Sequence, residues 1–121
     1  MEFGEMNTYL DRLRAHCMAK LGVVEDYPWG DTVWKVNGKM FAAGGETSVT
    51  VKSTVEKQSI LIQQPNIEKA AYVGRFGWVT VTVANDADLE LAFDLIDESY
   101  EMVSSKSKKK PKSYTMDEEP I

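Results

Sequence analysis

The sequence predicts an α+β domain, because helical patterns at both ends enclose a series of strand patterns. Apolar residues recur at helical spacing over residues 7–21 and again over residues 85–103. Between them, Asn37-Gly38 joins two short apolar runs. This dipeptide favours a β-hairpin, because a type I′ turn needs positive φ at both positions. With 121 residues, 43% of them hydrophobic, the chain is long enough to bury one core.

The first helix is expected from Asn7 to Leu21. Thr8 and Asp11 have the spacing of a capping box, in which each side chain bonds the other residue's backbone N–H. Gly22 is expected to end the helix in a left-handed conformation. The residues expected to face the core are Leu10, Leu13, Cys17 and Leu21.

An irregular loop is expected over residues 21–30, which contain two glycines, a proline and two acids. The loop also carries two large rings, Tyr27 and Trp29. Either both rings cover the open end of the core, or they line a pocket with Glu25 or Asp26 at its rim.

The middle of the chain is expected to hold three strands, a short helix and a connector. In order, these are Thr32–Val36, Lys39–Ala43, Ser48–Lys52, Val55–Gln63 and Asn66–Ala71. The helix is expected because Ser53 and Glu56 have capping-box spacing. Ile60-Leu61-Ile62 fits a strand equally well.

The stretch Tyr72–Val83 predicts a central strand with two unlike faces. Its second half alternates, so one face holds three valines and the other holds polar or aromatic residues. The valines are Val79, Val81 and Val83, and the opposite residues are Trp78, Thr80 and Thr82. Two glycines interrupt the entry to this strand, which also carries Arg75.

The last helix is expected to lie on the sheet through an apolar stripe. That stripe is Leu89, Ala92, Phe93, Ile96, Tyr100 and Val103. A second, acidic stripe consists of Asp86, Glu90, Asp94, Asp97 and Glu101. It is expected to be a solvated face, with loose cation binding as the alternative.

One domain is expected over residues 1–104, followed by a disordered lysine-rich tail over residues 105–121. The whole chain has a formal net charge of −5. Residues 1–104 hold nine basic and sixteen acidic residues, so this body is more acidic than the whole chain and repels phosphate at long range.

Several classes of protein are excluded or disfavoured. One cysteine permits no internal disulfide and favours a reducing compartment. No apolar run is long enough to span a membrane, and the N-terminus does not resemble a secretory signal, so a cytoplasmic protein is expected. One histidine and one cysteine cannot form a zinc site. No catalytic motif is present, so we expect neither an enzyme nor a cofactor.

Five motifs in order resemble those of the MmcQ/YjbR family, over about residues 7–103. They are Leu-Arg-Ala-His-Cys, Gly…Glu-Asp-x-Pro-x-Gly, Val-Trp-Lys-Val-Asn-Gly-Lys-Met-Phe, Tyr-x-Gly-Arg…Trp and Leu-Ile-Asp-Glu-Ser-Tyr-Glu-Met-Val. The resemblance implies an antiparallel sheet packed on one face by the N- and C-terminal helices, as in frataxin-like folds. It also implies a DNA-binding function, since members of this family are usually labelled so.

The open face of the sheet is the candidate binding surface. Besides Thr50 and Thr82, the residues assigned to binding are Trp29, Lys52, Tyr72, Arg75, Trp78 and Thr80. The alternative is that Tyr27 and Trp29 fold over Trp78, while Tyr72 and Arg75 form an aromatic–guanidinium pair.

The tail offers a second, electrostatic contact to nucleic acid through Lys106, Lys108, Lys109, Lys110 and Lys112. A further hypothesis is that these lysines contact the acidic stripe. We therefore expect a non-catalytic binding domain whose partner is nucleic acid. The alternative is a domain that binds a protein or a small ligand on the sheet face around Trp78, without affinity for DNA.

Overall fold

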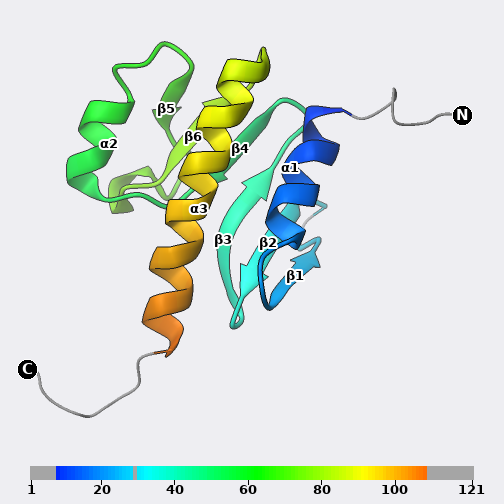
Figure 1. Ribbon diagram of the computed structural model, residues 1–121. Coiled ribbons are helices and arrows are strands. Elements are labelled where there is room, and N and C mark those ends of the chain that lie inside the picture. The colour runs from blue at the N-terminus through cyan, green and yellow to red at the C-terminus, as the bar shows by residue number, and fades with distance from the viewer. Residues whose placement is uncertain (1–7, 29, 109–121) are drawn as a thin grey trace, which may run out of the picture.

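Six strands form one antiparallel sheet, and α1 and α3 lie side by side across one of its faces (Figure 1). The computed structural model describes residues 8–28 and 30–108. The strand order is β1-β2-β3-β4-β6-β5. The elements are α1 (Tyr9–Met18), β1 (Val23–Asp26), β2 (Thr32–Val36), β3 (Lys39–Gly44), β4 (Ser48–Val51), α2 (Val55–Leu61), β5 (Ile67–Lys69), the 3₁₀ turn η2 (Gly74–Phe76), β6 (Val79–Thr82) and α3 (Asp86–Lys108). The predicted α+β class, with helices at both ends of the chain, is confirmed.

Helix α1 begins at the predicted capping box but ends early. Thr8 Oγ1 accepts from Asp11 N at 3.1 Å, and Asp11 Oδ2 accepts from Thr8 N at 3.1 Å. Because the helix ends at Met18, Leu21 lies beyond it and is 87% exposed, so its predicted place in the core is wrong. Gly22 is left-handed as expected, with φ of 78°, but it lies in the turn that enters β1.

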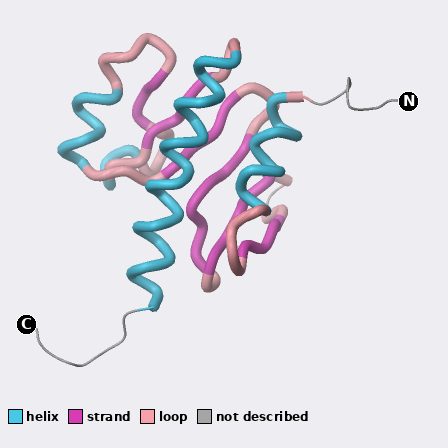
Figure 2. The backbone as a smooth tube through the Cα atoms, in the orientation of Figure 1, coloured by secondary structure: helices cyan, strands magenta, loops and turns pink. Residues whose placement is uncertain are grey.

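Two strands lie where a loop and a connector were expected. Both are edge strands: β1 pairs with β2, and the three-residue β5 pairs with β6 (Figure 2). Their backbone groups are satisfied by the neighbouring strand, which the local sequence does not reveal. Helix α2 confirms the helical alternative, but its N-cap is Thr54 rather than Ser53, because Thr54 Oγ1 accepts from Lys57 N at 3.0 Å.

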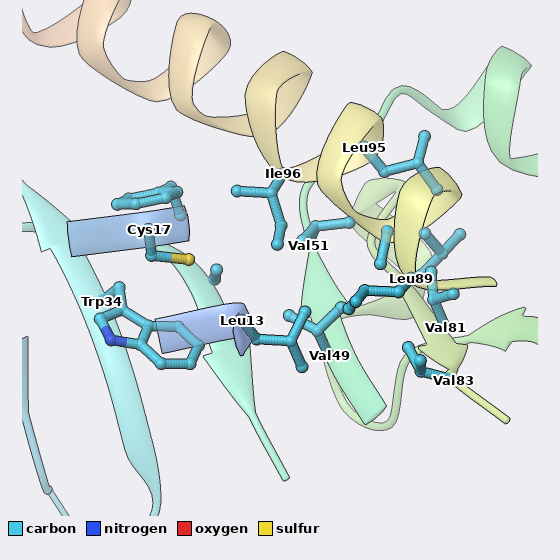
Figure 3. Close-up of a cluster of buried hydrophobic side chains, with 14 of the residues drawn as sticks. Leu13, Cys17, Trp34, Val49, Val51, Val81, Val83, Leu89, Leu95 and Ile96 are labelled. Carbon is cyan, nitrogen blue, oxygen red and sulfur yellow. The ribbon is translucent and has the colours of Figure 1, made fainter. Parts of the chain in front are cut away.

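The valine face of β6 is buried beneath α3, as the alternation predicts. Val79, Val81 and Val83 are each at most 1% exposed. Leu89 and Ile96 of α3 point toward this face, where they meet the valines of β4 and β6 (Figure 3). Burial of these aliphatic side chains is the main term that holds the helix on the sheet.

Trp34 fills the space between α1 and the sheet, beside Leu13 and Cys17 (Figure 3). The ring passes directly over Gly44 on the neighbouring strand. A Cβ atom at Gly44 would lie 2.5 Å from Cη2 of Trp34, which is closer than any stable contact. Glycine is therefore required at residue 44 by the ring and not by the backbone.

Glu25 ties this ring to α1. Its carboxylate accepts from Trp34 Nε1 at 2.8 Å and from Arg14 Nε at 3.0 Å, and also from the hydroxyl of Tyr27. Burial raises the pKa of Glu25, but the hydrogen bonds from Tyr27, Trp34 and Arg14 outweigh burial and hold it below its ordinary value near 4.5. Tyr27 and Glu25 therefore join β1 and β2 to α1.

Replacing Gly44 by alanine is expected to lower the free energy of unfolding by about 1–3 kcal/mol, because the new methyl group collides with Trp34. Urea unfolding followed by circular dichroism measures the loss. The control is Gly45→Ala, whose methyl group meets the movable hydroxyl of Ser48. Equal losses in both variants would show that the Trp34 contact is not the cause.

Stability is expected to fall as the pH drops below about 4.5, partly through Glu25. The unfolded carboxyl takes up its proton at higher pH than the folded one, so stability present above pH 4.5 is lost as the pH falls through the folded pKa. Urea unfolding of wild type and Glu25→Gln between pH 3 and 6 measures this, and the variant should show the shallower decline. Parallel pH profiles would rule out the contribution of Glu25.

Candidate functional site

The sheet divides between β3 and β4 at one end, and a buried serine fills the division. A β-bulge shifts the register of β2 and β3, so that Phe41 and Ala42 both face the core. Ala42 still pairs with Val51 of β4. At the next position, the hydroxyl of Ser99 on α3 lies between the two strands and replaces their direct hydrogen bonding. Ser99 Oγ donates to the carbonyl of Phe41 at 2.6 Å and accepts from the backbone N–H of Lys52 at 3.0 Å.

A groove of about 280 Å³ opens beside this division. Its lining residues are Lys39, Met40, Lys52, Trp78 and Val103. They come from β3, from the residues that follow β4 and precede β6, and from α3. Both charged residues in the lining are lysines, while Trp78, Met40 and Val103 supply an apolar surface. The groove therefore suits a ligand that has a flat apolar part and a negative charge.

The backbone of Trp78 is held in place by α2. Gln58 Nε2 donates to the carbonyl of Trp78 at 2.8 Å and to the carbonyl of Gly74 at 2.7 Å. Gly77 lies close to the start of α2, where a Cβ would lie 2.7 Å from the carbonyl of Ser53. The ring thus belongs to a fixed part of the fold. No feature of the sequence pointed to Gln58, which lies within α2 and is only 4% exposed.

Among the described residues, the structure brings the predicted binding residues together as two separate pairs. Lys52 and Trp78 share the groove. Thr80 lies on the open face of the sheet, where its hydroxyl is 2.7 Å from that of Thr50. Tyr72 is 98% exposed in a left-handed turn with φ of 67°. Trp29 lies outside the described residues.

Two predicted ring contacts are wrong. Arg75 lies over the ring of Phe76, 4.7 Å from its centroid, whereas Tyr72 is 98% exposed, so the guanidinium group does not pack against it. Tyr27 does not fold over Trp78, because it bonds Glu25 next to β1, and three strands separate β1 from β6 in the sheet.

The open face of the sheet is not covered by a described helix. α1 and α3 pack on the valine side, and α2 contributes Leu61 and Ile62 to the same core. Register places Thr50 and Thr80 opposite one another on the other face, with Glu68 of β5 beside Thr80. Val24 of β1 is 61% exposed. This face remains a second surface for a partner.

The acidic stripe of α3 is partly used to hold α1. Asp97 lies 2.8 Å from His16 Nε2 and also binds Lys20, while Asp86 lies 3.8 Å from Arg12. Burial raises the pKa of Asp97, but the hydrogen bonds from Lys20 and His16 outweigh it and lower the pKa overall. Asp97 therefore has a structural role, whereas Asp86, whose side chain is 86% exposed, remains solvated as predicted.

Three other features of the described residues were considered as sites: possible metal ligands, the thiol of Cys17 and two larger hollows. No group of three or more His, Cys, Asp or Glu side chains in residues 8–28 and 30–108 is placed to hold a metal ion. Burial raises the pKa of the Cys17 thiol to about 12, so it remains protonated. Two larger hollows, of about 610 and 460 Å³, follow the seam between α1 and α3. Their charged side chains are of both signs, unlike those of the groove.

Helix α3 continues to Lys108, past the predicted start of the tail at residue 105. Lys106 and Lys108 thus lie in its last turn, and Lys109, Lys110 and Lys112 lie outside the described residues. The end of α3 projects beyond the sheet on the side of the β2–β3 turn (Figure 1). Among the described helices, none has the length and apolar character to cross a membrane.

The groove and the fold can be compared with known proteins. A crystal structure of Deinococcus radiodurans protein DR2400, a DUF419 domain, is similar with a TM-score of 0.75 and 25% identity, over 85% of this chain and 83% of that one. A protein from Pseudomonas syringae shares the fold with a TM-score of 0.61 and 18% identity, over 76% of this chain and 96% of that one. The search of the curated proteins returned no match. The YjbR family model matches residues 18–102, and the chain therefore belongs to the YjbR family.

Proposed function

We propose that the chain is a non-catalytic binding domain that takes single-stranded nucleic acid in the groove of Trp78. The observation that carries this proposal is the meeting of one tryptophan ring with two lysines, Lys39 and Lys52, in the same groove. Proteins that bind single strands combine aromatic side chains, on which bases stack, with cations that follow the phosphates. The groove contains both.

The size of the groove favours a single strand. The groove has a volume of about 280 Å³. A groove of this size suits one base that is not stacked between the adjacent bases of its strand. The bases of a duplex are stacked in its interior. A protein reaches them only through the major or minor groove of the duplex, or by flipping a base out. Bases of a single strand are free to lie against Trp78.

The charge distribution limits the attraction for phosphates to the part of the molecule that holds the groove and the end of α3. Between Asp86 and Glu98, α3 holds six acidic residues and no basic ones, whereas Lys106 and Lys108 lie in its last turn. The lysines of the groove therefore lie toward the less acidic end of the molecule. With five tail lysines added to two in the groove, the upper limit of the salt slope for a single strand is about −5.

Replacing Trp78 by alanine is expected to weaken binding of a labelled oligothymidine by about 5- to 150-fold, because base stacking on one aromatic ring contributes about 1–3 kcal/mol. Trp78→Phe keeps a stacking surface and should retain most of the affinity. Fluorescence anisotropy measures both, and circular dichroism confirms that each variant is folded. Equal affinity of wild type and Trp78→Ala would contradict stacking on this ring.

Replacing Lys39 by glutamine is expected to make the salt slope of oligothymidine binding shallower by about 0.7, because one phosphate contact is lost. Arg12→Gln is the control: it also removes one positive charge, but on α1 and outside the groove lining. Anisotropy titrations between about 20 and about 200 mM salt measure the slopes. The same change in both variants would indicate attraction without a site.

The alternative is a domain that binds a protein or a small ligand on the open face of the sheet and has no affinity for nucleic acid. The uncovered face around Thr50 and Thr80 favours it, as does the acidic character of residues 1–104. If the wild-type chain binds no oligothymidine at low salt, this alternative replaces the first proposal.

A further inference from the structure

We propose that the acidic end of this chain's own C-terminus, Asp117-Glu118-Glu119, occupies the Trp78 groove and competes there with nucleic acid. The competition rests on the proposed function, but the contact itself does not. The acidic segment would stand in for phosphates, so that the full chain binds a single strand only by displacing it.

The end of α3 places this segment within reach. Val103 lines the groove, and α3 ends five residues later at Lys108, about 7.5 Å further along the helix axis. Asp117 follows nine residues after Lys108, a stretch that spans up to about 30 Å when extended. The chain is long enough to turn back and reach the groove with several residues to spare.

The positive charge of the groove attracts the acidic residues of the tail and not its lysines. The two charged residues of the groove are Lys39 and Lys52, whereas residues 117–119 are all acidic. The lysines at 109, 110 and 112 have the same sign as the groove and would be repelled from it.

The other possible contact, between the tail lysines and the acidic stripe, is less well supported by the structure. Asp97 already binds His16 of α1 and Lys20, which follows that helix, and Asp86 lies 3.8 Å from Arg12 of α1. Lys112 is four residues past the end of α3 and reaches back about 14 Å, far enough for Glu101 at about 11 Å along the helix but not for Asp86 at about 33 Å.

Apolar contacts add to the attraction. Tyr114, Met116 and Ile121 flank the acidic residues, and Trp78, Met40 and Val103 form the apolar lining of the groove. A segment tethered by a short linker has an effective concentration in the millimolar range, so even a millimolar contact is substantially populated.

The test uses the full chain and a variant with the acidic segment neutralised, D117N/E118Q/E119Q. In the absence of nucleic acid, the variant should shift the NMR signals of the groove, namely the amides of Lys39, Met40 and Lys52 and the indole N–H of Trp78. It should also bind oligothymidine about two- to tenfold more tightly than wild type. The control E46Q/E90Q/D94N removes three exposed carboxylates that form no ion pair among the described residues, and it should leave the groove signals in place.

Unchanged groove signals in D117N/E118Q/E119Q would overturn the inference, whether or not nucleic acid binds. Shifts at residues 90–101 instead would also overturn it, because they would locate the tail on the acidic stripe. Groove shifts that grow with protein concentration would assign the contact to a second molecule and so overturn the intramolecular form. Shifted groove signals in a chain that binds no oligothymidine would support the contact and refute the proposed function.

Discussion

The hydroxyl group of Ser99 sets the geometry on which the rest of the domain depends. A buried hydroxyl must find both a donor and an acceptor, and Ser99 finds them on two different strands, at Phe41 and Lys52. This requirement fixes where α3 crosses the sheet. The hydroxyl also bonds the carbonyl of Phe41 and the N–H of Lys52 at the point where β3 and β4 part, so that neither of these two backbone groups is left unsatisfied.

On the core side of this point, packing of large side chains leaves little freedom. Trp34 needs Gly44 beneath it and Glu25 beside it, and Glu25 in turn holds Arg14 of α1. α1 is also held from the other side by ion pairs with α3. The acidic character of α3 thus has a structural use within the fold, in addition to its effect on the charge of the surface.

The sequence allowed the local features to be predicted, and the missing features are those that depend on distant partners. The capping box of Thr8, the Asn37-Gly38 hairpin and the alternation of Val79 and Val81 are each determined within a few residues, and each is confirmed. β1 and β5 escaped prediction because their neighbours in the sheet make them strands.

The candidate site was predicted only in part, for the same reason. Alternation predicted Trp78 on the open face of the sheet, whereas Trp78 lines a groove together with Val103 of α3, the helix that packs on the valine side. Alternation also could not show the extra residue in β3 that brings Lys39 and Met40 to the groove, because a bulge is defined by the register of two strands. Tyr27 was misplaced because the strand that directly precedes it, β1, was taken for a loop.

The bulge in β3 also separates what evolution must keep from what it is free to change. Residues on the core side of the division are constrained by Trp34 and the valines, and a substitution there alters the stability of the whole domain. Residues 39, 40, 52 and 78 project past the division, where side chains are exchanged at small cost to folding. The same architecture can therefore carry different side chains at this corner of the sheet without losing its core.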